Sequence, residues 1–462
     1  MSLASPPSAV ETPSPAARAC GLAAGRLNLA DYARRFGDAH APLTAAQAQI
    51  EAERCYGCHD APCIAACPTG IDIPRFVQRI AQGNLRGAAR AILEANPLGG
   101  MCARVCPTDI LCEGACVRHT NEDKPVEIGA LQRHATDALF AAPSAPPLFS
   151  RAAPTGRRVA VVGAGPAGLA CAHGLARRGH SVNVYDPRPK AGGLNEYGIA
   201  AYKTADGFAQ REVQWLMSIG GITLHPGRSL GGDLSLDSLL ASHDAVFLGI
   251  GLAGVAALGI AGPQGSAGLR DAVDFIAELR QTDDLATLPV GRHVVVIGGG
   301  MTAVDAAVQS ALLGAETVHM VYRRGPEGLS ASQREQHWAQ THGVTIHHWA
   351  APAAVLHEGD TVTGITFART ALRDGRLVET GETFTLECDQ VLRAIGQTMR
   401  PDGLPPAMTL QAGRIATDAD GRTSLARVWA GGDCRAGGLD LTVEAVQHGK
   451  VAAESIDAFL RA

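Results

Sequence analysis

Two different patterns of apolar residues divide the chain. Between residues 41 and 140, apolar positions recur at spacings of three and four, for example at Phe76, Ile80, Ala88 and Ile92. This periodicity predicts amphipathic helices, with the cysteines of the region in the connecting loops. We therefore expect a small all-α domain over residues 41–140. Residues 1–40 before it are predicted to form an Ala- and Pro-rich tail with a short amphipathic piece around 31–36.

After a Pro-rich connector at 141–156, short apolar runs that end near glycine alternate with helical patterns. These runs lie at 158–162, 245–251, 293–297, 390–396 and 427–433. Strands that alternate with helices predict the parallel sheets of an α/β protein. Two of the runs lead into glycine-rich turns, which predicts two Rossmann-like nucleotide-binding domains. We place the first at 157–287 together with 397–462, and the second, inserted in it, at 288–396.

Composition and charge narrow the class of protein further. With 46% apolar and only 18% charged residues, the chain is not largely disordered. Its formal charge of −5 excludes a protein that works mainly by neutralising nucleic-acid phosphates. No run approaches the ~18 apolar residues of a membrane span, and the N-terminus lacks the pattern of a secretory signal. We therefore expect a cytoplasmic protein without a nucleic-acid or membrane partner.

The first glycine-rich turn has the pattern of a dinucleotide site. Its residues are Gly163, Gly165, Pro166, Ala167 and Gly168. Gly163 permits the tight turn, Gly165 lets the backbone approach a pyrophosphate, and Gly168 lets helix and strand pack closely. Asp186 ends the next predicted strand, where its carboxylate can accept a hydrogen bond from a ribose. A purely structural turn is the alternative, but the strand, helix and acid around it favour dinucleotide binding.

The second glycine-rich turn differs at the end of its following strand. The turn comprises Gly298, Gly299, Gly300, Met301 and Thr302, and alanine stands in place of the third glycine. The following strand ends in Arg323 and Arg324 rather than in an acid. An arginine there can pair with the 2′-phosphate of NADP, whereas an acid is typical of NAD or FAD sites. Two solvated surface arginines are the alternative interpretation.

Eight of the 12 cysteines lie in two groups within the predicted all-α domain. The first group is Cys55, Cys58, Cys63 and Cys67, and the second is Cys102, Cys106, Cys112 and Cys116. Closely spaced cysteines followed by proline are typical of iron-sulfur ligation, in which one group often gives a ligand to another cluster. Zinc would favour two CxxC pairs, and only one is present. Disulfide bonds would need an oxidising compartment, which nothing in the sequence indicates.

Two further motifs follow the order of a known flavoprotein family. Gly192 and Gly193 come after the strand of Asp186, and an AGGD sequence at 430–433 precedes a predicted helix. From Arg157 onwards the chain resembles the glutathione-reductase-like reductases. The resemblance implies FAD at the first turn and NAD(P)H at the second. The further FAD contacts that it implies are Gly193, Leu194, Lys203, Leu230, Gly432, Asp433, Thr442 and Val443, and the further NAD(P) contacts are Ala394, Ile395 and Gly396.

The all-α region resembles the iron-sulfur domain of dihydropyrimidine dehydrogenases. The resemblance rests on NPLGG at 96–100, RVCP at 104–107 and IGALQ at 128–132. The small subunit of glutamate synthase has the same plan. The sequence GGLNEYGIAAYK at 192–203 is most similar to the small subunit of the bacterial NAD-dependent dihydropyrimidine dehydrogenase.

Carried over to this chain, the family pattern implies two [4Fe-4S] clusters. One would be held by Cys55, Cys58, Cys63 and Cys116, and the other by Cys67, Cys106, Cys112 and Gln132. Counting alone would instead use all eight cysteines, with Cys102 as a ligand and Gln132 as an ordinary helix-surface residue. Both interpretations stay open, because an amide oxygen is a weak ligand for iron.

The family pattern also bears on the nicotinamide. NADP-dependent dihydropyrimidine dehydrogenases have a third basic residue shortly after the pair that matches Arg323 and Arg324. Here that position is Ser330, with Glu327 nearby. A carboxylate opposes a 2′-phosphate, so we expect NAD(H), with NADP(H) as the alternative.

These parts predict an oxidoreductase whose cofactors carry the electrons, with no side chain as general acid or base. A disulfide reductase would need a redox cysteine pair, and Cys171, Cys388 and Cys434 form no local pair. Eukaryotic family members continue into an FMN-binding barrel, which this sequence does not show. The resemblance therefore implies an electron-input subunit for a separate FMN-containing subunit that interconverts uracil or thymine with the 5,6-dihydro form. The alternatives are the glutamate synthase small subunit, which uses a carboxylate at the position of Gln132, and a non-enzymatic iron-sulfur redox scaffold.

Overall fold

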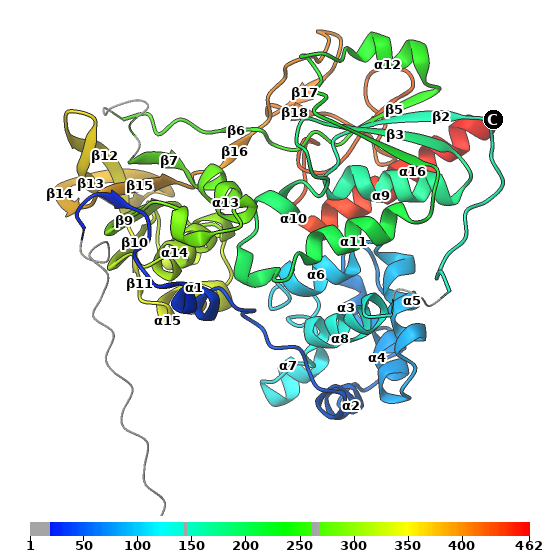
Figure 1. Cartoon of the computed structure of the whole chain (residues 1–462), viewed down its shortest axis with the longest axis horizontal. Coiled ribbons are helices and arrows are strands. Elements are labelled where there is room, and N and C mark those ends of the chain that lie inside the picture. Colours follow the sequence, from blue (N-terminus) through cyan, green and yellow to red (C-terminus); the bar gives the residue numbers. More distant parts are fainter. Residues whose placement is uncertain (1–18, 143–145, 261–265, 267) are drawn as a thin grey trace, which may run out of the picture. The chain divides into compact units, whose positions relative to one another are not determined.

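Two five-stranded parallel sheets organise the computed structural model of the chain, which describes residues 19–142, 146–260, 266 and 268–462 (Figure 1). The chain divides into two units. The first unit comprises residues 1–37 and 258–395, and the second comprises 38–257 and 396–462. The chain therefore leaves the second unit after Ala257 and returns to it at Gly396.

The parallel sheet of the second unit has the strand order β19-β5-β2-β3-β4. Its strands are β2 (Arg158–Val162), β3 (Ser181–Asp186), β4 (Ile222–Pro226), β5 (Ala245–Leu248) and β19 (Val428–Ala430). The helices around it are α9 (Pro166–Arg177), α10 (Leu194–Tyr197), α11 (Phe208–Met217), α12 (Leu236–Ser242) and α16 (Thr442–Arg461), with the 3-10 turn η2 (Ala201–Lys203). Helices α9 and α16 pack side by side (Figure 1). Their apolar faces meet the strands in a core that includes Val161, Phe247, Val446 and Ile456.

Short strand pairs complete the second unit. Strand β6 (Gly254–Val255) pairs antiparallel with β16 (Gln397–Thr398), and β17 (Leu410–Gln411) pairs antiparallel with β18 (Arg414–Ile415). The first pair joins the two chain segments that lead out of this unit and back into it.

The cysteine-rich part of the second unit is helical, which confirms the predicted all-α fold. Its helices are α2 (Ala45–Glu53), α3 (Pro62–Ala65), α4 (Ile73–Ala81), α5 (Leu85–Ala95), α6 (Gly99–Val105), α7 (Val117–Glu122) and α8 (Ile128–Phe140). Helix α4 begins where the Asp72 side chain accepts a hydrogen bond from the N–H of Arg75 at 3.2 Å. Its residues Phe76, Val77 and Ile80 are buried in one core with residues of α5 and α8.

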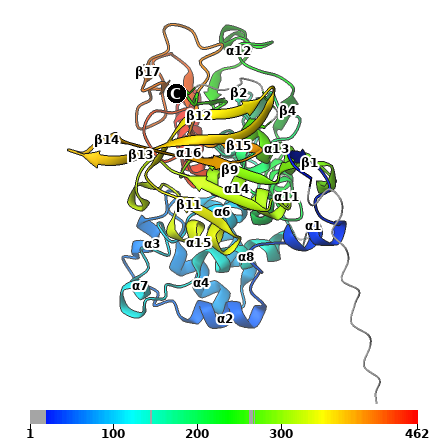
Figure 2. The same cartoon turned by 90° about the vertical axis from the view of Figure 1, so that its left-hand side faces the viewer.

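The first unit contains a parallel sheet and an antiparallel one. The parallel sheet has the order β11-β10-β9-β15-β7, formed by β7 (Leu269–Asp271), β9 (His293–Ile297), β10 (Thr317–Val321), β11 (Val344–His347) and β15 (Gln390–Arg393). Its helices are α13 (Ala272–Gln281), α14 (Met301–Leu312) and α15 (Gln333–Thr341), with the 3-10 turns η3 (Leu285–Thr287) and η4 (Pro326–Gly328). Figure 2 shows the antiparallel strands β12 (Ala350–Glu358), β13 (Thr361–Arg373) and β14 (Arg376–Glu387) next to one another.

Residues 19–37 contain a strand and a helix in the first unit. The helix coincides with the amphipathic piece expected around 31–36, whereas the rest of this segment was expected to be a tail. Strand β1 (Leu22–Ala23) pairs antiparallel with β8 (Val290–Gly291), and α1 (Leu29–Arg35) follows. Arg26 is buried, and its guanidinium donates to backbone carbonyl oxygens, among them those of Val290 at 2.9 Å, Ala19 and Gly21. A two-residue strand and a buried arginine leave no periodic apolar signal, so the sequence pattern did not reveal them. Residues 1–18 lie outside the described part.

Two other boundaries differ from the sequence-based expectation. Strand β7 pairs with β15, and residues 258–287 therefore belong to the first unit rather than with the domain that begins at 157. In the expected connector, Leu148 and Phe149 are buried in one cluster with Leu93 of α5. The connector is thus packed onto the helical region, apart from residues 143–145, which are not described.

Candidate functional site

The first glycine-rich turn joins β2 to α9 in a geometry that requires glycine. Gly163 has a φ of +101°, and a Cβ atom there would lie 2.2 Å from the carbonyl oxygen of Gly249. A Cβ on Gly168 would lie 1.8 Å from the carbonyl oxygen of Gly163. At Gly165, which caps α9, the nearest atom to an added Cβ is 3.8 Å away, on Gly193. The turn is therefore held by close backbone contacts at two glycines and has open space at the third, which fits a bound pyrophosphate.

Asp186 ends β3 and is tied to the same turn. Its Oδ2 accepts a hydrogen bond from the N–H of Ala164 at 2.7 Å, and its Oδ1 accepts one from the N–H of Arg188 at 2.8 Å. Burial raises the pKa of Asp186, and these hydrogen bonds oppose that shift. The carboxylate is thereby fixed beside the turn, where a ribose hydroxyl of a bound dinucleotide would donate to it.

Two segments from far along the chain meet this turn. An added Cβ on Gly193 would lie 2.7 Å from the Cα atom of Gly165 in the turn. An added Cβ on Gly432 would lie 3.0 Å from the Cβ atom of Ala167 in the turn. Thr442, the first residue of α16, donates from its hydroxyl to Oδ1 of Asn195 in α10 at 2.8 Å. The turn, α10 and the start of α16 thus form one site. Asn195 was not among the predicted residues, although its place directly after Gly193 and Leu194 was an available signal.

The other residues expected to contact FAD all lie in the second unit, and they differ in how deeply they are buried. Burial raises the pKa of Asp433 to about 6, and Asp440 adds to the shift. Val443 is buried in α16, whereas Leu194 is exposed at the start of α10. Lys203 is buried at the end of η2, and Leu230 packs in an apolar cluster with Tyr185.

The second glycine-rich turn joins β9 to α14. An added Cβ on Gly298 would lie 2.2 Å from the carbonyl oxygen of Ala394, so the turn and the end of β15 are in contact. The carbonyl oxygen of Gly299 accepts hydrogen bonds from the N–H groups of Ser330 at 3.1 Å and Ala331 at 3.0 Å. The loop after β10 therefore folds back over the turn. Gly300 is the N-cap residue of α14, and Met301 and Thr302 are the first two residues of that helix. Ile395 and Gly396 follow the end of β15.

The charged residues after β10 flank this second turn. Arg323 and Arg324 are both exposed, while their carbonyl oxygens accept hydrogen bonds from Thr370 Oγ1 at 2.7 Å and from the N–H of Trp349 at 3.1 Å. The backbone is thus held in place, while both arginines are exposed. The carboxylate of Glu327 lies over Gly325 in the same loop, since an added Cβ there would be 2.4 Å from it.

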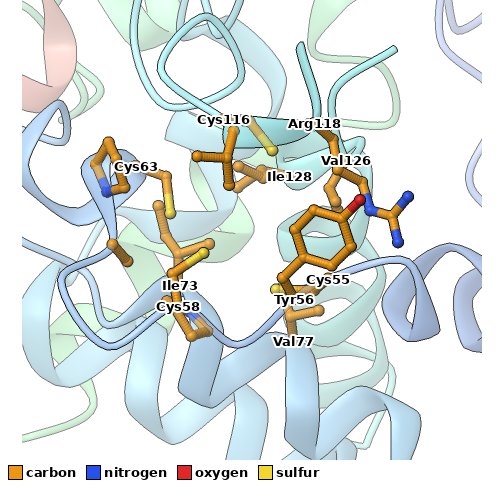
Figure 3. Close-up of a pocket in the computed structure, with 14 residues that line it drawn as sticks. Cys55, Tyr56, Cys58, Cys63, Ile73, Val77, Cys116, Arg118, Val126 and Ile128 are labelled. Atoms are coloured by element: carbon orange, nitrogen blue, oxygen red, sulfur yellow. The ribbon is translucent and has the colours of Figure 1, made fainter. Parts of the chain in front are cut away.

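Four cysteines of the helical region line one pocket (Figure 3). They are Cys55, Cys58, Cys63 and Cys116, and most other wall residues are apolar, among them Ile73, Val77, Val126 and Ile128. Burial raises the pKa of Cys63 to about 11 and also raises that of Cys55. Such thiols become thiolates when they coordinate positive metal ions. The donor set and the apolar walls fit an iron-sulfur cluster held by these four residues.

Cys106 lies near Cys102 and near the other two cysteines predicted for the second cluster. A side-chain hydrogen bond with Cys102, together with burial, raises the pKa of Cys106, and the neighbouring Cys112 and Cys67 raise it further. Gln132 in α8 is only 6% exposed, and its Nε2 donates to the carbonyl oxygen of Gly99 at 2.6 Å. The structure thus brings Cys102 as well as the predicted ligands Cys67 and Cys112 to Cys106. It also buries Gln132, which is not the ordinary surface residue of the counting interpretation.

The described residues contain neither a compact group of metal-ligating side chains nor a disulfide bond. Among the described residues, no three His, Cys, Asp or Glu side chains are close enough to share one metal ion. All 12 cysteines, which lie within the described ranges, are free of disulfide bonds. None of the described helices is long and apolar enough to cross a membrane.

Two family models match the chain over most of its length. The model described as dihydropyrimidine dehydrogenase domain II, 4Fe-4S cluster, matches residues 32–143, and that of pyridine nucleotide-disulphide oxidoreductase matches residues 157–449. Among solved structures, FprA from Mycobacterium tuberculosis in complex with NADPH has a TM-score of 0.55 at 18% identity, over 66% of this chain and 85% of that one. This likeness concerns the fold alone.

Several curated proteins are similar at the sequence level. The putative oxidoreductase AegA of Escherichia coli K12 is 36% identical, over 91% of this chain and 67% of that one. The NAD-dependent dihydropyrimidine dehydrogenase subunit PreT homolog of Salmonella typhi is 34% identical, over 89% of this chain and 94% of that one. The NADPH glutamate synthase small chain of Escherichia coli K12 is 33% identical, over 91% of this chain and 93% of that one. The chain therefore belongs to the pyridine nucleotide-disulphide oxidoreductase family, as an NAD(P)H-dependent electron-transfer protein with FAD and [4Fe-4S] clusters, of the type found in PreT and the glutamate synthase small chain.

Proposed function

We propose that this chain is the electron-input subunit of a dihydropyrimidine dehydrogenase. In this proposal it passes electrons between NAD(H) and a separate FMN-containing subunit, which interconverts uracil or thymine with the 5,6-dihydropyrimidine. The observation that carries the proposal is the match to the PreT homolog, which spans 94% of that subunit. The buried Gln132 adds support, because the dihydropyrimidine dehydrogenase pattern has glutamine at this ligand position.

The side chains and backbone of this chain would bind and orient the groups. When bound, FAD accepts an electron pair from the nicotinamide and releases single electrons, which iron-sulfur clusters conduct. The amides at the start of α9 would hold the FAD pyrophosphate, and Asp186 its ribose. We assign one cluster to Cys55, Cys58, Cys63 and Cys116, and the other to Cys67, Cys106, Cys112 and Gln132.

We infer that NAD(H) is the preferred nicotinamide. Ser330 lies over the Gly299 carbonyl of the second turn, where a third basic residue would reinforce Arg323 and Arg324. Glu327 lies in the same loop and would repel a 2′-phosphate. The two exposed arginines keep NADP(H) as a weaker alternative.

A glutamate synthase small subunit is the second candidate, favoured by a match that is almost as extensive. The two candidates share the flavin, nicotinamide and cluster sites and differ in the subunit that receives the electrons. Gln132 separates them, since the synthase pattern has a carboxylate there. On this ground we prefer dihydropyrimidine reduction.

Mild anaerobic affinity purification from the native cells, followed by mass spectrometry, tests the assignment. We expect a stoichiometric FMN-barrel subunit and NADH-dependent reduction of uracil or thymine by the complex. A glutamine-amidotransferase subunit in its place would overturn the substrate assignment and leave the cofactor sites intact. Failure of the purified, cofactor-loaded chain to oxidise NADH with an artificial acceptor would instead favour a non-enzymatic scaffold.

A further inference from the structure

Lys450 connects the helix that begins at the flavin site to the iron-sulfur region. It lies on α16, whose first residue, Thr442, is bonded to Asn195 at the flavin site. The Lys450 Nζ donates to the carbonyl oxygen of Ala95 at the end of α5 and to that of Thr69 at 3.4 Å. One rigid helix therefore contacts both the proposed flavin site and the cysteine-rich region.

The Thr69 carbonyl belongs to the loop that carries Cys67. Thr69 Oγ1 lies 3.3 Å from the sulfur of Cys67, and the N–H of Gly70 donates to the Cys67 carbonyl oxygen at 2.8 Å. Thr69 itself is only 6% exposed. The ammonium group of Lys450 is therefore bound to a tight turn that begins at a proposed cluster ligand and in which Thr69 is buried.

The charge of Lys450 is not cancelled by a contacting carboxylate. Its two hydrogen-bond partners are neutral carbonyl groups, and among the described residues none of the ion pairs within 4.0 Å involves its ammonium. Lys450 also lines a cavity of about 270 Å³ with Glu94 and Glu454, but these acids pair with Arg177 at 2.9 Å and Arg178 at 3.4 Å. Burial lowers the pKa of Lys450, whereas the charges of Glu454, Cys67 and Glu94 act in the opposite direction.

We propose that Lys450 is a positioning residue for electron transfer, whose positive charge raises the reduction potential of the cluster held by Cys67. The cluster gains one electron on reduction and becomes more negative, while Lys450 keeps its proton and no bond to it breaks. A partly buried cation stabilises that added charge more than an exposed one, because water and salt screen it less. The inference rests on the proposed second cluster, and it is independent of the substrate and the partner subunit.

Three variants of the full, cluster-loaded chain test the role of this charge. Lys450→Gln removes the charge and keeps a hydrogen-bond donor for the two carbonyl oxygens, whereas Lys450→Arg keeps the charge. Lys124→Gln is the matched control, because Lys124 lies in the same cysteine-rich region with its side chain 62% exposed. Each protein is titrated anaerobically against potential, with the clusters followed by electron paramagnetic resonance and the flavin by absorbance.

We expect Lys450→Gln to lower the ratio of reduced to oxidised cluster about tenfold at a fixed potential, for one of the two clusters. For a one-electron couple this corresponds to a fall of about 59 mV in the midpoint potential. Lys450→Arg and Lys124→Gln should leave that potential close to the wild-type value. An unchanged potential in Lys450→Gln, or an equal shift in Lys450→Arg, would overturn the inference. Loss of iron in Lys450→Gln alone would make Lys450 an assembly residue instead. Iron for only one cluster in the wild-type protein would refute the proposed second site itself.

Discussion

The carboxylate of Glu212 accepts a hydrogen bond from the backbone N–H of Gly100 at 2.7 Å, across 112 positions of sequence. Glu212 is fully buried on α11, beside the parallel sheet of the second unit, and it also accepts a hydrogen bond from the N–H of Met101. Both N–H groups belong to the first turn of α6, the helix that carries Cys102. A buried acid thus anchors the start of a cysteine-bearing helix, where it satisfies N–H groups that have no partner within the helix.

The buried position of Glu212 predicts a characteristic pH dependence of stability. Burial raises the pKa of Glu212 from 4.5 to about 8, against the opposing effect of its two hydrogen bonds. The unfolded chain loses this proton near pH 4.5 while the folded chain keeps it, so the free energy of unfolding falls as pH rises from about 4.5 to 8. Glu212→Gln should flatten that decline in thermal melts between pH 5 and pH 8. The exposed Glu53→Gln is the control, and an unchanged slope in Glu212→Gln would contradict the expectation.

Two glycines of the first turn should respond differently to alanine. At Gly168 the added Cβ would collide with the carbonyl oxygen of Gly163, so Gly168→Ala should destabilise the fold by about 3 kcal/mol or more. At Gly165 the atom nearest to an added Cβ is 3.8 Å away, so the free energy of unfolding of Gly165→Ala should lie within about 1 kcal/mol of the wild-type value. The variant should nevertheless bind FAD weakly. Thermal melts and the flavin-to-protein ratio measure both effects. Normal flavin content in a folded Gly165→Ala protein would refute the pyrophosphate site.

The ligands of the second cluster can be distinguished by iron content. If Gln132 is a ligand, Gln132→Leu should lose this cluster, and Cys102→Ala should keep about eight iron atoms per chain. Both residues are buried, so a melt of each variant shows whether the fold is intact. The comparison uses iron and acid-labile sulfide per flavin. Loss of the cluster in Cys102→Ala with retention in Gln132→Leu would make Cys102 the ligand, beside Cys106.

The proposed preference for NAD(H) should weaken when a basic residue is placed over the second turn. Ser330→Arg would add a guanidinium next to Gly299 and Gly300, where it can meet a 2′-phosphate. One charge-assisted hydrogen bond contributes about 1.5–3 kcal/mol, so kcat/KM for NADPH should rise about 10- to 100-fold. Gln340→Arg adds the same charge at an exposed position on α15 and should change little. Equal kinetics in the two variants would show that position 330 does not face the nucleotide.

Local patterns in the sequence were sufficient for the elements that depend on neighbouring residues. The strand, glycine turn and helix at Gly163 and Gly298 are short-range features, since a tight turn and a close approach of helix to strand select glycine directly. The helical region followed from apolar spacing, and its cysteine groups from their spacing and the prolines after Cys67 and Cys106. The resemblance to known families supplied the grouping of the cysteines, of which Cys55, Cys58, Cys63 and Cys116 line one pocket.

Contacts between distant residues were decided only by the tertiary structure. The hydrogen bonds of Glu212 to α6, of Lys450 to Ala95 and Thr69, and of Thr442 to Asn195 each join residues more than 100 positions apart. The pairing of β1 with β8 and of β7 with β15 likewise placed residues 19–37 and 258–287 in the first unit. Periodicity records which face of an element is buried and contains no information on its partner, so side chains that link two regions carry no local signal.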